Sequence, residues 1–277
     1  MLIIADSGST KTSWSIIDGQ NIIQKETIGL NPLMTEESII RQSFNDVIHA
    51  QPINKIKAVY FYGAGCASDV LCNKVKKAIA SVVYLDDIFV KSDIYAAAHG
   101  LLNKKTGWVA ILGTGSNLAY YNGTDLKQHN PSLGYILGDE GSGAYLGKKL
   151  LQMIYYKQCS NKLIAAFNEY SKTSLTEIIE NIYHKPQANK YLASFTYFIK
   201  QNETNESIKQ LLTNAFKKFI KTHILPYKNV YDSSIAFTGS VAYIFQNQLK
   251  EVCSHYKLEI LAIEKSPMQG LIYYHKK

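Results

Sequence analysis

Residues 112–143 read LGTGSNLAYYNGTDLKQHNPSLGYILGDEGSG, and two glycine-rich segments within this stretch decide how the chain is interpreted. The first, GTGSN at 113–117, lies between two apolar runs and predicts a tight turn joining two strands, where glycine lets backbone N–H groups approach a ligand. The second, GDEGSG at 138–143, ends an apolar segment and predicts the start of a helix. Because the first N–H groups of a helix lack partners within the helix, we expect them to hold an anion or a sugar hydroxyl.

Neither segment matches a common nucleotide-binding motif. The sequence GKK at 147–149 resembles the end of a P-loop, but that motif requires glycine in place of Ser142 and a hydroxyl residue in place of Lys149. The dinucleotide pattern GxGxxG fails at 113–118 and at 141–146, where leucine replaces the third glycine. Spacing alone is therefore as compatible with structural turns as with ligand binding.

Composition indicates a folded protein without an obvious nucleic-acid partner. The chain has 277 residues, of which 46% are apolar and 19% charged, and this length suits two domains. Its formal charge is +8, yet Arg41 is the only arginine among 30 basic residues. Base readout and bidentate phosphate recognition rely on arginine, and the lysines form no continuous stripe, so we expect no binding to nucleic acid.

The cysteines and the apolar runs favour a cytoplasmic protein. The four cysteines form no CxxC pair and no zinc-ligand spacing, so we expect reduced thiols. The chain enters a short apolar run at once, without a basic leader, and contains no run of about 18 apolar residues. We therefore expect neither export nor a membrane partner.

The predicted elements repeat in the same order in the two halves of the chain. The first half contains strands at 2–5, 13–17 and 21–28, then helix 35–48, strand 55–62, helix 68–80, strand 81–90 and helix 92–100. The second half contains strands at 108–112, 118–121 and 126–129, helix 141–156, a broken helical stretch at 160–225, strand 234–237, helix 241–253, strand 258–263 and helix 268–275.

This repetition predicts an α/β protein made of two βββαβαβα domains with a cleft between them, where ligands commonly bind. We expect an N-terminal domain at 1–103 and a C-terminal domain at 104–266, with a helical insertion at about 160–225. The last helix, at about 267–277, is expected to pack back on the N-terminal domain.

Four motifs in this order give the chain a family resemblance: DSGSTKT at 6–12, GTGSN, GYILGDEGSG at 134–143, and TGSVA at 238–242. Together they resemble the N-acetylglucosamine kinase-like branch of the BadF/BadG/BcrA/BcrD ATPases, within the superfamily of actin-like, sugar kinase and Hsp70 ATPases with ribonuclease H-like domains. The resemblance covers essentially the whole chain, and GDEGSG is its most specific motif. It implies ATP-dependent phosphorylation of an amino sugar, most simply N-acetylglucosamine at its 6-hydroxyl, with ATP and Mg²⁺ as cofactors and a homodimer as the assembly.

The resemblance also assigns roles to single residues. Asp6 would hold Mg²⁺ through water, and Asp93 would be the general base that takes the proton of the sugar hydroxyl. The residues implied for ATP are Asp6, Gly8, Ser9, Thr10, Lys11, Gly113, Thr114 and Gly115 at the phosphates, with Gly239 and Ser240 beside the adenosine. The residues implied for the sugar are Asn31, Asp93, Ser116, Asn117, Gly134 and Asp139.

Some of these residues have simpler interpretations. Asp93 beside Ser92 is also typical of a helix N-cap, and Glu140 is expected to serve the start of the following helix. Ser7 departs from the glycine of many relatives, and because serine is small we expect no loss of function.

Two other functions remain open at this point. One is an iron–sulfur activator ATPase of the same family, for which Cys66 and Cys72 are six residues apart, although this spacing matches no known cluster motif. The other is a sugar or nucleotide sensor without catalysis, because fold does not fix function. The simultaneous presence of Asp6, Asp93 and Asp139 favours the kinase. The sequence leaves open which amino sugar is the acceptor, with glucosamine and N-acetylmuramic acid as further candidates.

Overall fold

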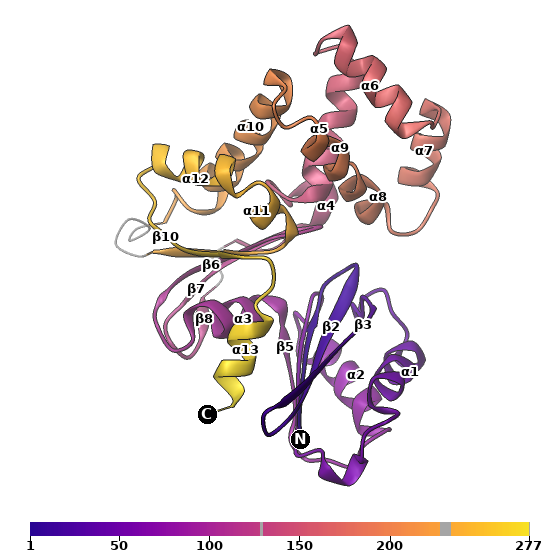
Figure 1. The fold of residues 1–277 in the computed structure, drawn as a ribbon, viewed down its shortest axis with the longest axis vertical. Coiled ribbons are helices and arrows are strands. Elements are labelled where there is room, and N and C mark those ends of the chain that lie inside the picture. The colour runs from indigo at the N-terminus through magenta and orange to yellow at the C-terminus, as the bar shows by residue number, and fades with distance from the viewer. Residues whose placement is uncertain (128–129, 228–233, 277) are drawn as a thin grey trace. The chain divides into compact units, whose positions relative to one another are not determined.

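The computed structural model describes residues 1–127, 130–227 and 234–276 and divides the chain into two units (Figure 1). Unit 1 contains Met1–Lys105 and Pro267–Lys277, so the C-terminal end returns to the N-terminal part of the chain. Unit 2 contains Thr106–Ser266.

Unit 1 is built on a mixed sheet of five strands in the order β3-β2-β1-β4-β5. The strands are β1 (Leu2–Ser7), β2 (Lys11–Asp18), β3 (Asn21–Ile28), β4 (Ala58–Gly63) and β5 (Ile88–Ser92). The first three form an antiparallel meander, while β4 and β5 continue the sheet in parallel with β1. The carboxyl ends of β1, β4 and β5 therefore meet at one edge of the sheet, where ligands gather in α/β proteins.

Helices cover both faces of this sheet, as Figure 1 shows. The helices α1 (Glu37–Ile48) and α2 (Asp69–Ala80) pack one face around a core that includes Phe44 and Phe61. The other face carries α3 (Asp93–Ala97), a π-helical turn η2 (Ala98–Leu102) and α13 (Met268–His275). A short 3₁₀ turn, η1 (Ile53–Lys55), precedes β4. The predicted start of α2 follows from Ser68, whose side chain accepts the N–H of Leu71.

Unit 2 repeats this sheet with the order β10-β9-β6-β7-β8. Its strands are β6 (Gly107–Leu112), β7 (Ser116–Tyr121), β8 (Leu126–Lys127), β9 (Ile235–Thr238) and β10 (Ile260–Glu264). The central strand β6 pairs antiparallel with β7 and parallel with β9, as β1 pairs with β2 and β4 in unit 1. The predicted α/β fold with a duplicated βββαβαβα topology is confirmed.

The helices of unit 2 enclose one large core. They are α4 (Gly134–Leu137), α5 (Gly143–Tyr155), α6 (Asn161–Ser171), α7 (Leu175–Tyr183), α8 (Ala188–Ser194), α9 (Thr196–Gln201), α10 (Glu206–His223), α11 (Ser240–Ile244) and α12 (Gln246–His255). The helices α6 to α10 make up the expected helical insertion, and several of their phenylalanines, such as Phe167 and Phe216 at 0% exposure, are fully buried. The aromatic side chains of this segment therefore form part of the core of unit 2.

The structure corrects several expected boundaries. Residues 81–87 are not a strand, because the N–H groups of Val82 and Val83 turn back to bind the carbonyl of Ile79. The helix expected at 241–253 is interrupted at Phe245, whose ring is buried in the core. The short helix α4 was not expected. The end of the strand predicted at 126–129 lies outside the described residues.

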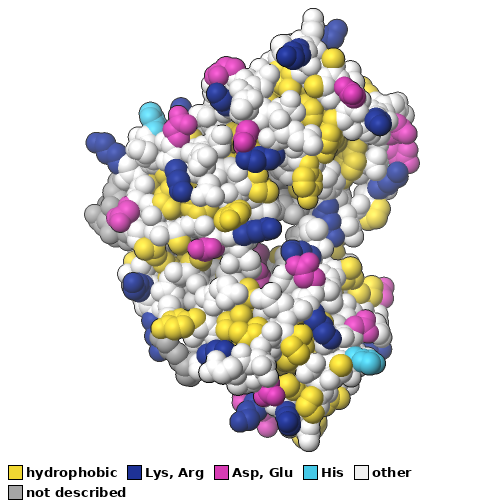
Figure 2. All heavy atoms as spheres, in the orientation of Figure 1, with side chains coloured by type: hydrophobic (Ala, Val, Ile, Leu, Met, Phe, Trp, Pro, Cys, Tyr) yellow, Lys and Arg dark blue, Asp and Glu magenta, His cyan; other side chains and the backbone are white. Residues whose placement is uncertain are grey.

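The surface agrees with the scattered lysines in the sequence. Figure 2 shows the basic side chains dispersed over the visible face, with acidic side chains among them. Among the described residues, no helix combines the length and the apolar character needed to cross a membrane.

Candidate active site

The turn between β1 and β2 carries the first group of predicted residues in unit 1. Gly8 donates its N–H to the carbonyl of Lys11 at 2.9 Å and closes the turn, and Asp6 lies on β1 just before it. Gly29 also holds the turn, because its N–H donates to the carbonyl of Thr10 at 3.1 Å. A Cβ at Gly29 would lie 2.5 Å from the carbonyl oxygens of Gly8 and Ser9, so only glycine fits. The turn is thus held in one shape while its own surface stays accessible.

Lys11 is paired with an acidic side chain in this structure. Its ammonium pairs with Glu26 on β3, and both side chains are more than half exposed. Exposed pairs of this kind contribute roughly 0–1 kcal/mol. The pair can therefore be broken at little cost.

Asn31 is anchored beside the turn that follows β4. Its side-chain oxygen accepts the N–H of Leu33 at 3.0 Å, which leaves the amide NH₂ group as a donor. Gly65 has φ of +84°, and a Cβ there would lie 2.0 Å from the Asn31 side-chain oxygen. The glycine is required both by its backbone conformation and by the closeness of this amide.

Asp93 is the first residue of α3, directly after the end of β5. The N-cap position belongs to Ser92, so the interpretation of Asp93 as the cap residue is wrong. Cys66 lies in the turn after β4, close enough for the charge of the Asp93 carboxylate to act on its thiol. Burial, the neighbouring Cys72 and the charge of Asp93 all raise the pKa of the Cys66 thiol.

In unit 2, the turn after β6 is joined to the start of α5. Gly143 and Ala144 donate their N–H groups to the carbonyls of Gly113 and Thr114 at 2.8 and 3.1 Å. The next N–H, of Tyr145, binds the side-chain oxygen of Ser142. The expectation that the first N–H groups of this helix hold an anion or a sugar hydroxyl is therefore wrong, since the turn and Ser142 already occupy these donors.

Asp139 packs against the same turn. Its φ is +55°, and its side chain accepts the N–H of Ser116 at 3.3 Å. A Cβ at Gly115 would lie 2.9 Å from the Asp139 carboxylate, so this glycine makes room for it. Burial raises the pKa of Asp139, and the hydrogen bond from Ser116 offsets part of that effect. Of the predicted sugar residues, Ser116 and Asp139 are thus in direct contact.

The other two predicted sugar residues of unit 2 are Asn117, which lies in β7, and Gly134, which lies in α4. The side-chain oxygen of Asn117 accepts the N–H of Leu118 in β7, at 2.9 Å. Gly134 begins α4 with φ of +71°, and no atom lies within 4 Å of the place a Cβ would take.

Glu140 has a different role from the one expected. Its carboxylate lies 3.0 Å from Nε2 of His223, on α10, and it does not serve the start of α5. Lys148 lies nearby on α5, and its ammonium donates to the carbonyl of Tyr135 in α4 at 3.1 Å. Burial lowers the pKa of Lys148, whereas the charges of Glu140 and Asp139 act in the opposite sense. Sequence reasoning missed both His223 and Lys148.

The third glycine turn of unit 2 lies against the first. Gly239 has φ of +109°, and a Cβ there would lie 2.4 Å from the carbonyl oxygen of Leu112 and 3.1 Å from the nitrogen of Gly113. Ser240 follows as the first residue of α11. The residues predicted for the adenosine and for the phosphates are therefore adjacent in this unit.

Comparisons with known proteins bear on these arrangements. No known protein-family model matches the sequence. Among solved structures, a Porphyromonas gingivalis protein described as a candidate N-acetylglucosamine kinase superposes with a TM-score of 0.94. It is 36% identical over 99% of this chain and 98% of that protein. The chain belongs to the N-acetylglucosamine kinase family.

More distant kinases share the fold of this N-acetylglucosamine kinase family member. A Chromobacterium violaceum candidate N-acetylglucosamine kinase has a TM-score of 0.76 and 17% identity over 99% of this chain and 98% of that one. A ROK family glucokinase of Streptomyces griseus, solved with glucose and AMPPNP, has a TM-score of 0.59 and 15% identity, with the same coverage of both chains. At these identities the likeness shows the fold alone.

One curated relative matches in part. The N-acetylmuramic acid/N-acetylglucosamine kinase of Clostridium acetobutylicum is 29% identical over 102 residues, which are 37% of this chain and 33% of that protein. The match thus spans about a third of the relative. The resemblance inferred from the four motifs is confirmed.

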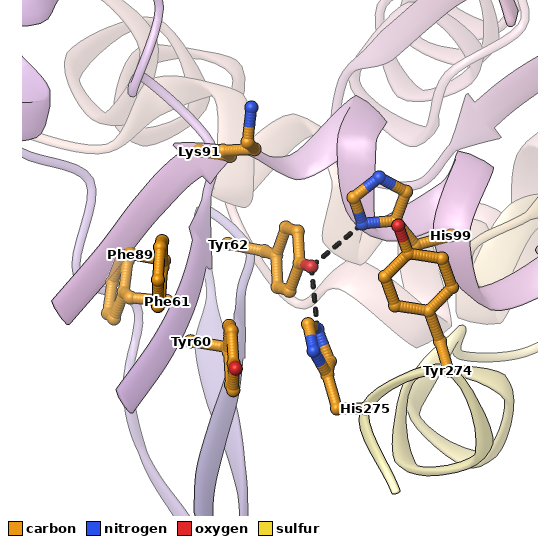
Figure 3. A pocket seen from close by; sticks show the side chains of 8 residues that line it. All are labelled: Tyr60, Phe61, Tyr62, Phe89, Lys91, His99, Tyr274 and His275. Carbon is orange, nitrogen blue, oxygen red and sulfur yellow. Dashed lines mark hydrogen bonds between the residues drawn. The ribbon is translucent and has the colours of Figure 1, made fainter. Parts of the chain in front are cut away.

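Unit 1 of this family member also contains a cavity of about 270 Å³ (Figure 3). No predicted site residue lines it. Its walls are Tyr60, Phe61, Tyr62, Phe89, Lys91, His99, Tyr274 and His275. The Tyr62 hydroxyl lies 2.8 Å from Nδ1 of His99 and 2.8 Å from Nε2 of His275, so it ties α13 to β4 and η2. The cavity therefore borders the attachment of the C-terminal helix.

Because two buried histidines, His99 and His275, take part in this attachment, we expect the protein to lose stability in acid. Burial lowers the pKa of His99 to about 4, with the charges of His275 and Lys91 adding to the effect, and burial lowers the pKa of His275 to about 4. The unfolded chain binds these protons near pH 6.5, so the contribution of the two histidines to the free energy of unfolding should be constant above that pH and fall between about 6.5 and 4. Urea unfolding across this range measures the profile. His275→Gln should flatten it and His49→Gln, on an exposed residue, should not; identical profiles for all three proteins would contradict this origin.

Proposed function

We propose that the protein is an ATP-dependent kinase that phosphorylates an amino sugar, N-acetylglucosamine, at its 6-hydroxyl. The observation that carries this proposal is the likeness, at 36% identity over 99% of the chain, to a protein described as a candidate N-acetylglucosamine kinase. The geometry within each unit supports it, because Gly8 is hydrogen-bonded to Lys11 in unit 1 and Ser116 to Asp139 in unit 2.

The first supporting feature is the set of glycine turns. The turn at 8–10 in unit 1 is closed by its own hydrogen bond and braced by Gly29, so its backbone is fixed before a nucleotide binds. In unit 2, Gly239 brings the last turn onto Leu112 and Gly113. Preorganised backbone N–H groups and hydroxyls are the donors that bind phosphate oxygens. The unit 1 turn would hold phosphates with Ser9, Thr10 and Lys11.

The residues also fit a bound magnesium ion. Among the described residues, no cluster of three histidine, cysteine or acidic side chains that could hold a metal is found. Mg²⁺ in kinases keeps several waters and uses one or two carboxylates together with the phosphates, so a single Asp6 beside the turn suffices. When bound, the ion would neutralise charge on the phosphates of ATP.

The sugar would be recognised by amide and carboxylate groups. Asn31 keeps its NH₂ group as a donor because its oxygen is used by Leu33. In unit 2, Asp139 is oriented by Ser116 and half-buried. Polar groups held in this way reject ligands that lack the matching hydroxyl or amide, because the groups are then left unpaired.

Asp93 would accept the proton from the attacking 6-hydroxyl. It stands at the carboxyl end of β5, on the edge of the unit 1 sheet where β1 also delivers Asp6. A base has to reach the hydroxyl in line with the γ-phosphoryl group, and most of the remaining catalysis is positioning.

A substrate panel tests the proposal. Coupled release of ADP should depend on N-acetylglucosamine and should be at least about tenfold slower, as kcat/KM, with glucose or glucosamine, since a site that binds the N-acetyl group loses that contact. Omitting Mg²⁺ should stop the reaction. If no hexose or amino sugar stimulates ADP release, while ATP still binds, the sensor function is favoured. Iron and labile sulfide in the purified protein would favour the activator ATPase.

A further inference from the structure

Ser7 is a buried residue to which the proposed reaction assigns no role, and three segments of unit 1 meet at it. Its hydroxyl oxygen accepts the N–H of Leu30 at 3.0 Å and lies 2.8 Å from the Thr12 hydroxyl oxygen. Its carbonyl oxygen accepts the N–H of Ala64 at 2.8 Å. The side chains of Ser7, Thr12 and Leu30 are 0% exposed, so water cannot substitute for any of these partners.

The direction of each hydrogen bond in this group can be assigned. The Thr12 hydroxyl donates to the carbonyl of Ile28 at 2.8 Å. A hydroxyl has a single proton, so the Thr12 oxygen acts as acceptor towards Ser7. Ser7 therefore donates to Thr12 and accepts from Leu30. The result is one continuous chain, from the Leu30 N–H through Ser7 and Thr12 to the Ile28 carbonyl, with every member satisfied, and such buried networks specify one arrangement.

Two of the segments that meet at Ser7 carry a residue of the proposed site, and the third lies against one of these residues. Ser7 directly precedes Gly8 in the turn at 8–10 that is proposed to hold the phosphates of ATP, called the phosphate turn below. Leu30 directly precedes Asn31. Ala64 directly precedes Gly65, whose backbone lies against the Asn31 amide. Ser7 thus lies one residue before the phosphate turn, and its hydroxyl binds Leu30, the residue next to Asn31.

We propose that Ser7 is a positioning residue, which fixes the Asn31 amide relative to the phosphate turn through the Leu30 N–H. The inference rests on the proposed function, because that function gives Asn31 to the sugar and the turn to ATP. Glycine or alanine at position 7 offers no oxygen to Leu30. Serine is then more than a small residue tolerated in place of glycine.

The main test is Ser7→Ala in the full-length protein. The variant leaves the Leu30 N–H buried without its acceptor, so the segment carrying Asn31 should shift to find another partner. We expect the KM for N-acetylglucosamine to rise about tenfold, the equivalent of losing one buried hydrogen bond. The KM for ATP should stay within experimental error, because Gly29 and the Gly8 hydrogen bond still brace the turn.

Thr12→Val is the matched control. Valine is close to threonine in shape but lacks the hydroxyl that accepts from Ser7, so this variant perturbs the same buried network. The Ser7 oxygen that binds the Leu30 N–H is kept. It should lower the stability without raising the KM for the sugar. An equal rise of that KM in both variants would mean that any loosening of the β1–β2 hairpin has this effect, and the proposal would be overturned.

A double-mutant cycle with Asn31→Ala tests whether Ser7 acts through Asn31. In the Asn31→Ala background, Ser7→Ala should cause no further rise in the KM for the sugar, since coupled residues are not additive. Additive effects would refute the proposed route.

A readout without catalysis separates this inference from the proposed function. In ¹⁵N spectra of the protein without ligands, the Asn31 side-chain amide signals should move or broaden in Ser7→Ala and stay unchanged in Thr12→Val. If the wild type shows no sugar-dependent ADP release, the proposed function fails while this measurement still decides on the positioning. Unchanged Asn31 signals in Ser7→Ala would refute it.

Discussion

Asp93→Asn should lower sugar-dependent ADP release by about a hundredfold to ten-thousandfold, the usual contribution of a general base. Asparagine keeps the shape and the polarity of the side chain but cannot take up a proton at neutral pH. ATP should still bind, because the phosphate turn of unit 1 is held by Gly8 and Gly29. Steady-state ADP release and an ATP binding titration measure the two effects separately.

Asp69→Asn is the matched control for this variant. Asp69 is also the first residue of a helix, α2, and also follows a serine at the N-cap, Ser68. It therefore experiences the same loss of charge at a helix start, worth about 0.3–1 kcal/mol, but it has no proposed role towards the sugar or ATP. Its turnover should match that of the wild type. Normal turnover in Asp93→Asn would remove the general base from the mechanism, whereas a similar loss in both variants would point to the fold.

Gly239→Ala should destabilise unit 2 by at least about 3 kcal/mol, because the left-handed backbone alone costs about 1–3 kcal/mol for a residue other than glycine. The new Cβ would also lie 2.4 Å from the carbonyl oxygen of Leu112, which belongs to a rigid central strand. For a unit of this size the melting temperature should fall by about 6–12 °C. ATP binding should weaken as well, since the first and the last glycine turns of unit 2 are forced apart.

Gly19→Ala separates the two causes. Gly19 has φ of +60°, and no atom lies within 4 Å of the position of its Cβ, so alanine there meets strain but no clash. Its melting temperature should fall by a smaller amount, and ATP binding should be unchanged. Equal shifts in the two variants would show that the contact between Gly239 and Leu112 has no special weight.

Local signals explain why much of the fold could be predicted. Ser68 starts α2 where a serine before an apolar period predicts it, and α13 spans Met268–His275 as expected. Alternating and continuous apolar runs predicted the strands that flank the glycine turns. Each of these features depends on residues a few positions apart, so propensity and capping suffice. The break at Phe245 could not be predicted in this way, because burial of its ring in the core outweighs the local preference for a continuous helix.

The stretch at 112–143 separates what the sequence determined from what only the tertiary structure decided. The sequence alone determined that two glycine-rich motifs, the second of which contains Asp139, lie within one stretch, and the order of the four motifs indicated the family. Only the folded chain decided that the N–H groups starting α5 bind the carbonyls of Gly113 and Thr114, and that Glu140 faces His223. These partners lie roughly 30 to 80 residues apart, and their contact depends on how strands and helices pack. A local pattern shows which groups need partners, but only packing selects the partner from the whole chain.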